Sequence, residues 1–454
     1  MMLQGHRWTD RWLHDRQLMA WAIAGLGALL AVYMRWYFIV HTEVYQPLRG
    51  HTDFGGAAEY YRYAWNLFHH HLFSSAYADS PQPLADSFRD PGYPLYLAAF
   101  MGIEPAYEEW YALVVLSHAV LGGLTVACIV LALRGALPTW LLAAVAVTTA
   151  LWPHSVALSA YVLSENLTAP LWALAILLLR EAASRQSVVV TIIAGLAFAA
   201  AGLTNSVITP LVLPLAAVLA WKRLMPARLV WVLVIAAVLP AGAWSVRNAQ
   251  VTAGLSSTYR AKVNLVQGSW PTYHLATQLE ARHDPVGIAT SQAINAEIQV
   301  LDTDTTAGLR VMAARMARAP GTTIAWYLGK PALLWGWQVG LGAGGFYIYP
   351  TNHSPFVSEP LWRGIEALAF IANGLIAALA LAGLGFALLD RKTGVALLGF
   401  AVTAGWVTLV YGVLQSDPRY SIPFRGAEMA LAASALWTAG GVVRRRLGDR
   451  AHTN

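Results

Sequence analysis

Residues 51–96 read HTDFGGAAEYYRYAWNLFHHHLFSSAYADSPQPLADSFRDPGYPLY and form a polar segment directly after the first long apolar run. The segment begins with one carboxylate, Asp53, continues as an aromatic amphipathic stretch, and ends in a turn rich in proline and glycine. Most of the remaining sequence is apolar. Such a segment predicts a site held at the membrane surface, which favours an enzyme acting on a lipid-linked substrate over a simple pore.

The composition is that of a membrane protein. Hydrophobic residues make up 57% of the 454 residues and charged residues only 12%, against roughly 25% in soluble domains. Several uncharged runs reach the ~18–20 residues that cross a bilayer, and backbone groups in lipid must be satisfied within such a run, which makes it a helix. We therefore expect an all-α polytopic membrane protein. The net charge of +6 does not indicate a nucleic-acid partner, because most of the basic excess lies in short loops.

Ten apolar runs predict about ten transmembrane helices. They cover residues 17–41, 110–134, 138–156, 162–180, 187–203, 207–221, 228–246, 361–389, 393–415 and 425–443. One set of connecting loops is rich in arginine and lysine, which places it in the cytoplasm, whereas most acidic residues fall on the other set. The pattern predicts a multi-pass protein of the plasma (inner) membrane, with both termini cytoplasmic and the active site on the outer face.

A further apolar segment, residues 322–349, is expected to be re-entrant or interfacial. It is apolar enough to enter the membrane, but a full crossing would carry the basic loop at residues 390–392 to the outer face. We thus divide the chain into an N-terminal transmembrane module with a catalytic first outer loop, an outer loop with the re-entrant segment, and C-terminal transmembrane helices. These parts are residues 1–246, 247–360 and 361–454.

Two long outer loops are each expected to carry an amphipathic helix. The first loop covers residues 42–109, and its helix over 57–73 has an apolar, aromatic face that would lie in the bilayer interface. The second loop covers residues 247–321, begins with weak structure, and continues in a helix over 305–319 that follows good capping residues.

Five short motifs resemble those of a known family. They are Glu59-Tyr60 with Ala64 and Asn66-Leu67; Arg89-Asp90-Pro91-Gly92-Tyr93-Pro94-Leu95; Leu163-Ser164-Glu165-Asn166-Leu167; Pro240 with Trp244 and Arg247-Asn248; and Asp417-Pro418-Arg419-Tyr420-Ser421-Ile422-Pro423. In this order, each at the outer end of a predicted helix, they are similar to motifs of the integral-membrane glycosyltransferases of the C superfold. Protein O-mannosyltransferases and the bacterial aminoarabinose transferase of lipid A belong to that group. The resemblance implies transfer of a sugar from a polyprenyl-phosphate donor to a lipid, glycan or protein acceptor at the outer face of the membrane.

Two positions depart from the family pattern. The family usually carries an acidic residue three positions before the Glu-Tyr pair, where this chain has Gly56, and the nearest acid is Asp53. The family's small-Leu-Thr-Arg-Pro hairpin reads Gly202-Leu203-Thr204-Asn205-Ser206 here. Either Asp53 reaches the place of the family's acidic residue, or the acidic role has moved to another residue. A cation expected near the Gly202–Ser206 hairpin is also missing.

A carboxylate near the membrane surface is the natural base for such a transfer, because the acceptor hydroxyl must lose its proton as it attacks with inversion. Asp53 is the first catalytic candidate and Glu59 the second. Each also has a structural interpretation, since Asp53 can begin a turn and Glu59 suits the first turn of a helix.

The phosphate of the donor needs cations to stabilise its charge rather than a general acid. Arginine can bind a phosphate with two parallel hydrogen bonds, whereas lysine acts as a point charge. The candidates for the donor phosphate are Arg89, Arg247, Lys262 and Arg419. The candidates for a substrate pocket are Tyr60, Tyr93, Glu165 and Tyr420. Interfacial aromatic belts are the alternative role for the tyrosines, and a plain helix start is the alternative for Glu165.

No cofactor is assigned with certainty. A divalent cation between the donor phosphate and Asp53 or Glu59 is compatible with the resemblance, but the three histidines at 69–71 point in different directions on a helix and cannot ligate one ion. No nucleotide-binding loop appears, which fits a donor other than a nucleotide sugar. A transporter or flippase for lipid-linked substrates is the alternative function, and an inactive lipid-bound scaffold is a third. A transporter would place charges near helix midpoints, whereas here they gather at helix ends.

Overall fold

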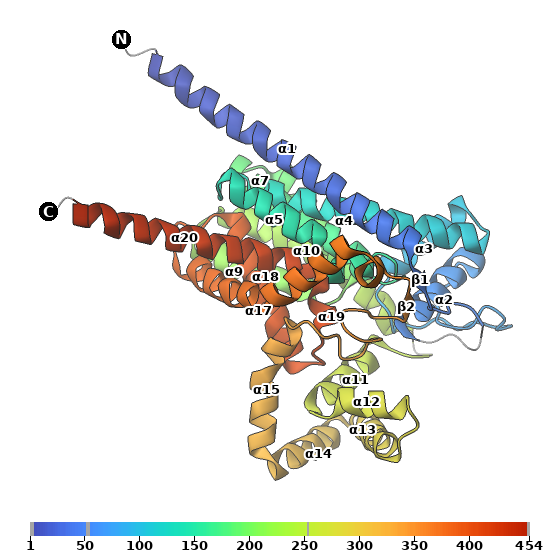
Figure 1. Ribbon diagram of the computed structural model, residues 1–454. Coiled ribbons are helices and arrows are strands. Elements are labelled where there is room, and N and C mark those ends of the chain that lie inside the picture. The colour runs from blue at the N-terminus through green and yellow to red at the C-terminus, as the bar shows by residue number, and fades with distance from the viewer. Residues whose placement is uncertain (1–3, 51–54, 252–253, 452–454) are drawn as a thin grey trace.

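The computed structural model describes residues 4–50, 55–251 and 254–451, and nearly all regular structure in this part of the chain is helical (Figure 1). The helices of the bundle are α1 (Gln4–His41), α4 (Tyr107–Leu133), α5 (Thr139–Leu151), α6 (Pro153–Leu158), α7 (Glu165–Arg185), α8 (Val188–Thr204), α9 (Val212–Trp221), α10 (Ala227–Gln250), α17 (Pro360–Leu389), α18 (Val395–Val413) and α20 (Arg425–Ala451). The other helices are α2 (Gly55–His70), α3 (Gly92–Ile103), α11 (Ser257–Ser269), α12 (Tyr273–Glu280), α13 (Pro285–Thr303), α14 (Thr305–Arg318), α15 (Pro320–Leu334), α16 (Pro355–Ser358) and α19 (Pro418–Ser421). Two 3-10 turns, η1 and η2, cover Thr209–Leu211 and Ile422–Phe424, and β1 (Glu43–Val44) pairs antiparallel with β2 (Thr351–Asn352).

The bundle is that of an all-α, multi-pass membrane protein. Among the described residues, six helices are long and apolar enough to cross a membrane, namely α1, α4, α7, α10, α17 and α18. Each of the ten apolar runs of the sequence contains helix, although the number of crossings stays a prediction. On α17, Leu368, Ile371 and Leu375 are all more than half exposed, and a large exposed apolar surface of this kind marks a membrane contact.

One core joins the N-terminal and C-terminal membrane helices. The ring of Trp172 on α7 is fully buried, and its centroid lies 5.7 Å from that of Phe400 on α18 and 5.5 Å from that of Phe424 in η2. The Trp172 indole also donates to the hydroxyl of Thr403 at 3.1 Å. The regions before residue 246 and after residue 361 therefore form a single bundle around shared aromatic contacts.

The second outer loop forms a helical lobe below the bundle (Figure 1). The helix expected over 305–319 corresponds to α14, whose start is capped by the side chain of Asp304. The expectation of weak structure before it is wrong, because α11, α12 and α13 fill that stretch. Together with α14, these helices pack around a small core of their own, which includes Val266, Ile298 and Met312.

The segment 322–349 begins as α15, which links the lobe to the bundle, and continues as irregular chain toward β2 (Figure 1). The side chain of Lys330 on α15 is fully buried and donates to the backbone oxygens of Gly268 and Leu414 at 2.9 and 2.6 Å. These bonds attach α15 both to the lobe and to the end of α18. Its expected re-entrant or interfacial position stays a prediction.

The amphipathic helix of the first outer loop is α2, but its apolar face does not lie against lipid. Tyr63 and Ala64 are fully buried and Tyr60 is 6% exposed, because α2 packs on α3 and on the residues around it. The period of the sequence predicts an apolar stripe on this helix, but the period is the same whether the helix buries that face in protein or in lipid. The interfacial placement of this face is therefore corrected.

Candidate active site

Two arginine–glutamate ion pairs meet at the start of α2. Nε of Arg89 donates to Oε2 of Glu59 at 2.6 Å, and Nε of Arg419 donates to Oε1 of Glu165 at 2.8 Å. A Cβ atom placed on Gly56 would lie 3.3 Å from Nη2 of Arg89 and 4.0 Å from Nη2 of Arg419. The two guanidinium groups thus converge on one point of the backbone, and each uses its Nε for its own glutamate.

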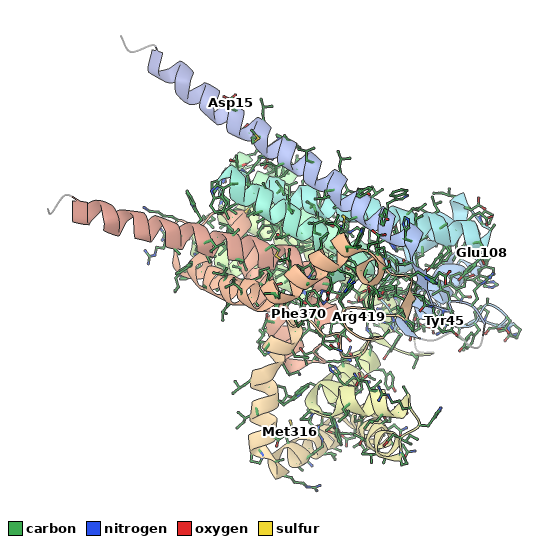
Figure 2. The ribbon with its side chains drawn as sticks, in the orientation of Figure 1. Asp15, Tyr45, Glu108, Met316, Phe370 and Arg419 are labelled. Carbon is green, nitrogen blue, oxygen red and sulfur yellow. The ribbon has the colours of Figure 1, made fainter. Side chains whose placement is uncertain are left out.

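The site lies where the bundle meets the irregular segments above the lobe, as the position of Arg419 shows (Figure 2). The side chains of Arg89 and Arg419 are 20% and 23% exposed, whereas that of Glu165 is 7% exposed. The cations therefore remain accessible from one side while one of the carboxylates that hold them is buried.

Tight local packing positions Arg89. It precedes the Asp-Pro-Gly sequence that opens α3, and a Cβ on Gly92 would lie 2.4 Å from the hydroxyl oxygen of Thr204. Only glycine fits this approach, so the turn docks directly on the end of α8.

Arg419 is positioned by the side chain before its proline. Oδ1 of Asp417 accepts from the backbone N–H of Arg419 at 2.9 Å, and Oδ2 accepts from those of Gly340 and Leu341 at 2.8 and 3.1 Å. Asp417 therefore caps α19 and ties it to the chain after α15. Its role in the structure is to hold the backbone that carries Arg419.

Tyrosines enclose the two ion pairs. Tyr60 donates its hydroxyl to Oγ of Ser164 at 2.9 Å, and the Arg89 guanidinium lies 5.1 Å from the centre of the Tyr60 ring. Tyr420 stacks on Tyr411 with ring centres 4.7 Å apart. Tyr60 and Tyr420 thus border the site from opposite elements.

Tyr93 takes a different position from the one expected of a pocket residue. It is fully buried, contacts the Tyr60 ring edge-on at 5.1 Å, and shares a hydrogen bond of 3.1 Å with Nε2 of His118. It supports Tyr60 from behind. Tyr349, which the sequence did not single out, lies close to Gly55, and its hydroxyl accepts from the N–H of Ala57 at 3.4 Å.

The electrostatics keep both arginines charged. Burial alone would lower the pKa of Arg89, but Tyr60 and Glu59 raise it above its usual value. Burial acts in the same direction on Arg419, and the charge of Glu165 raises its pKa above the usual value. Each guanidinium uses its Nε for a glutamate and directs its Nη2 toward Gly56, and charged N–H donors of this kind suit an anionic ligand.

The other two cations expected at the phosphate have different partners. Nη1 of Arg247 donates to the backbone oxygen of Asp86 at 2.6 Å, and the guanidinium stacks 4.8 Å from the ring of Trp244. Lys262 pairs with Asp302 at 3.1 Å within the lobe. Of the four cations expected from sequence, the structure therefore brings Arg89 and Arg419 together, while Arg247 fastens the first outer loop to α10.

A cation that the sequence did not reveal lies at the turn after α8. Nη2 of Arg260, on α11, donates to Oδ1 of Asp90 at 3.0 Å and to Oγ of Ser206 at 3.4 Å. Oδ2 of Asp90 accepts from the N–H of Ser206 at 3.2 Å. Arg260 thus supplies a positive charge beside Asn205, where the sequence lacked one. No local pattern indicates that α11 packs against this turn.

Asp53, the first candidate for the base, lies outside the described residues. Among the described residues, no three side chains of His, Cys, Asp or Glu gather as metal ligands, and Glu59 and Glu165 are each paired with an arginine. A divalent cation between the donor phosphate and Asp53 or Glu59 therefore stays a prediction.

Comparisons with known proteins give a likeness of fold. No known family profile and no curated protein matches the chain. The apo oligosaccharyltransferase of Archaeoglobus fulgidus matches with a TM-score of 0.50 at 16% identity, over 95% of this chain and 52% of that one. Two further structures from that organism match less well. They are the oligosaccharyltransferase AglB with an inhibitory peptide and a dolichol-phosphate, with a TM-score of 0.47 at 14% identity over 95% and 52% of the chains, and an oligosaccharyltransferase complex with Zn and sulfate, with a TM-score of 0.49 at 14% identity over 93% and 50%.

The chain spans about half the length of these proteins. At such low identity the likeness concerns the fold alone. It leaves the family, the donor and the acceptor open.

Proposed function

We propose that this protein is a glycosyltransferase that moves a sugar from a polyprenyl-phosphate donor to an acceptor at the outer face of the membrane. One observation carries the proposal: Arg89 and Arg419 converge on Gly56 at the start of α2. Four of the five sequence motifs contribute to this cluster, because Glu59, Arg89, Glu165 and Arg419 come from four separate segments. The fold shared with an oligosaccharyltransferase supports the same class of reaction.

In the proposed reaction, the acceptor oxygen attacks the anomeric carbon from the face opposite the phosphate. The new carbon–oxygen bond forms as the bond from the anomeric carbon to the phosphate oxygen breaks, and the electron pair leaves with the polyprenyl phosphate. The acceptor proton passes to a carboxylate. The product sugar is inverted at its anomeric carbon.

The proposed role of each residue follows from the contacts that it makes. Arg89 and Arg419 bind the phosphate and stabilise the charge that develops on it, while Glu59 and Glu165 hold the two guanidinium groups in place. Asp53 is the proposed base, because the Glu59 carboxylate already accepts a hydrogen bond from Arg89. Arg260 adds positive charge at the neighbouring turn, and Tyr60 and Tyr420 border the sugar.

The test is transfer of radiolabelled sugar from a panel of polyprenyl-phosphate sugars by the full chain in lipid vesicles, followed through both labelled product and released polyprenyl phosphate. We expect wild type to release the phosphate and Asp53→Asn to lose release and transfer. Lys262→Ala is the matched control, because its cation pairs within the lobe, and it should keep full activity.

Two results would overturn the proposal. Folded wild type that neither transfers sugar nor releases phosphate from any donor would remove the reaction and favour a transporter of lipid-linked substrates. Equal loss in the Lys262→Ala control and in an Arg89→Ala variant would show that the paired arginines have no special part.

A further inference from the structure

A cleft lies between α15 and α17, away from the arginine cluster. Its volume is about 520 Å³, within the range of roughly 300–1,000 Å³ that is usual for ligand pockets. Leu328 on α15 and Leu381 on α17 line the cleft and are 76% and 71% exposed, whereas Ala404 on α18 and Leu431 on α20 line it and are buried. The two exposed leucines therefore form its rims, and α18 and α20 form its floor.

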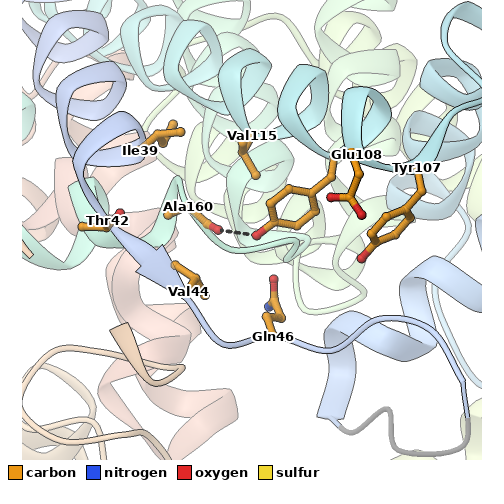
Figure 3. Close-up of a pocket in the computed structure, with 9 residues that line it drawn as sticks. Ile39, Thr42, Val44, Gln46, Tyr107, Glu108, Val115 and Ala160 are labelled. Carbon is orange, nitrogen blue, oxygen red and sulfur yellow. Dashed lines mark hydrogen bonds between the residues drawn. The ribbon is translucent and has the colours of Figure 1, made fainter. Parts of the chain in front are cut away.

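The walls of this cleft differ from those of a smaller cavity at the end of α1. The smaller cavity, of about 230 Å³, carries Glu108 and Gln46 in its walls (Figure 3). The walls of the cleft are mostly apolar, and their neutral polar side chains are paired within the protein. The indole of Trp335 donates to the hydroxyl of Thr408 at 2.8 Å, and Nδ2 of Asn373 donates to the backbone oxygen of Trp335 at 3.2 Å.

One acidic residue, Glu428, lines the cleft, but its carboxylate is directed into the protein. Oε2 of Glu428 accepts from Nη1 of Arg425 at 2.7 Å, and Oε1 is buried. Among the described residues that line the cleft, none is a cation. The cleft thus presents little to a polar or anionic ligand, and an apolar ligand fits it best.

The position of the opening indicates where an apolar ligand comes from. The exposed apolar surface of α17 that marks a membrane contact begins at Leu368 and continues to Leu381. On α15, Ile324 is 60% exposed and lies one turn before Leu328. The rims of the cleft thus continue the lipid-facing surface. Phospholipid chains are the molecules present there at the highest concentration, which favours their binding over that of a scarce lipid.

The side chains of α17 along the cleft are small and leave room for a ligand. Gly374, Ala377 and Ala378 line it, and a Cβ atom on Gly374 would enter open space, with no contact within 4 Å. An unfilled gap deprives its walls of dispersion contacts, which a hydrocarbon chain restores. The gain is one of packing, because a lipid chain is already in apolar surroundings before it enters.

We infer that this cleft binds one acyl chain of a bilayer phospholipid. The bound acyl chain fills the space beside α15 and stabilises the attachment of this helix to α17, α18 and α20. The polypeptide after α15 leads to Gly340 and Leu341, whose N–H groups bind the Asp417 side chain that positions Arg419. The lipid therefore supports an element that reaches the candidate active site, and its binding does not depend on the proposed reaction.

The test is photo-crosslinking of the full-length protein in vesicles of a phospholipid that carries a diazirine in one acyl chain, with mass spectrometry to locate the adducts. We expect adducts at Trp335 and Thr408, which line the cleft, and at Leu368, on the open lipid-facing surface. Gly374→Leu fills the cleft and should lower the first two adducts roughly fivefold or more, while the adduct at Leu368 stays unchanged. Gly242→Leu is the matched control, because Gly242 is an exposed glycine of α10 with open space around it, and it should change none of the adducts.

Ala378→Leu is a second variant that fills the cleft, and it should act as Gly374→Leu does. In a further arm, a few molecules of polyprenyl phosphate are added per protein, and the phospholipid adducts should persist. The inference is overturned if wild type forms no adduct at Trp335 or Thr408, or if both filling variants lower these adducts no more than Gly242→Leu does. It is also overturned if the added polyprenyl phosphate abolishes the adducts, because the occupant would then be the chain of the donor.

Discussion

Two arginines that are close together in the sequence, Arg419 and Arg425, each pair with a glutamate, and the two pairs have different roles. Arg419 reaches Glu165 on another helix, is 23% exposed, and directs its Nη2 toward Gly56. Arg425 is 1% exposed and pairs at 2.7 Å with Glu428, one turn further along α20. The chemistry of the pair is the same in both places, so access to the guanidinium distinguishes them.

The buried Arg425–Glu428 pair, here called the enclosed pair, links α20 to the chain after α15. Besides binding Glu428, Arg425 donates to the backbone oxygens of Trp335 and Gly336 at 3.2 and 2.6 Å, where the chain leaves α15. Its hydrogen bonds go to the protein itself. The Arg419 pair instead fixes one edge of the guanidinium and presents another toward the site, which is what a ligand-binding cation requires.

The largest expected effect is on stability, from breaking the enclosed pair. Arg425→Leu leaves Glu428 as a buried charge without its partner, which costs about 3–5 kcal/mol. Thermal unfolding in detergent, followed by tryptophan fluorescence, measures the loss. The double variant Arg425→Leu/Glu428→Leu should recover much of it, because no charge is then left unpaired. Equal destabilisation in the single and double variants would contradict this account.

The next largest effect is on sugar transfer, and it comes from substituting Arg419, whose pair with Glu165 is accessible. Arg419→Lys keeps a positive charge but cannot bind Glu165 and a phosphate together through one planar group. We expect transfer to fall about 10²–10³-fold, as when an electrostatic contact to the transition state is lost. The unfolding temperature should change far less than in Arg425→Leu. A variant with wild-type transfer would remove Arg419 from the reaction.

A smaller, positive effect tests the point where the two guanidinium groups converge. If the acid of Asp53 acts there, Gly56→Asp placed on Asp53→Asn should recover part of the lost transfer, roughly tenfold over the single variant. A Cβ at this position meets Nη2 of Arg89 at 3.3 Å, so a small adjustment accommodates it. Asp53→Asn with Gly56→Ala is the control, and rescue by alanine would refute the role of the carboxylate.

A separate effect, on the pH dependence of stability, concerns Lys330, a buried cation bonded to backbone oxygens. Burial lowers its pKa from 10.5 to about 8. Between pH 8 and 10.5 the unfolded chain therefore binds the proton more strongly, and stability rises with pH across this window. Lys330→Met should remove that rise in detergent unfolding curves, whereas Lys262→Met, in the lobe, should keep it.

The features that could be predicted from the sequence are those that one segment determines alone. Uncharged runs gave helices because lipid leaves the backbone no other partner, and Asp304 marked the start of α14 because a cap acts on the next few residues. The helices α11, α12 and α13 were not predicted because they depend on contacts with one another and with α14, which no single segment of the sequence reveals. The partner of the apolar face of α2 could not be predicted, because the period of a helix does not reveal whether protein or lipid covers it.

The sequence by itself determined a helical membrane protein and the motif residues Glu59, Arg89, Glu165 and Arg419. Only the tertiary structure decided which cations meet. It joined Arg419 to Glu165 across 254 positions and brought Arg260 to the turn at Asn205 and Ser206. Such meetings depend on how whole helices pack, and no local periodicity or motif encodes the distance between residues so far apart in the chain.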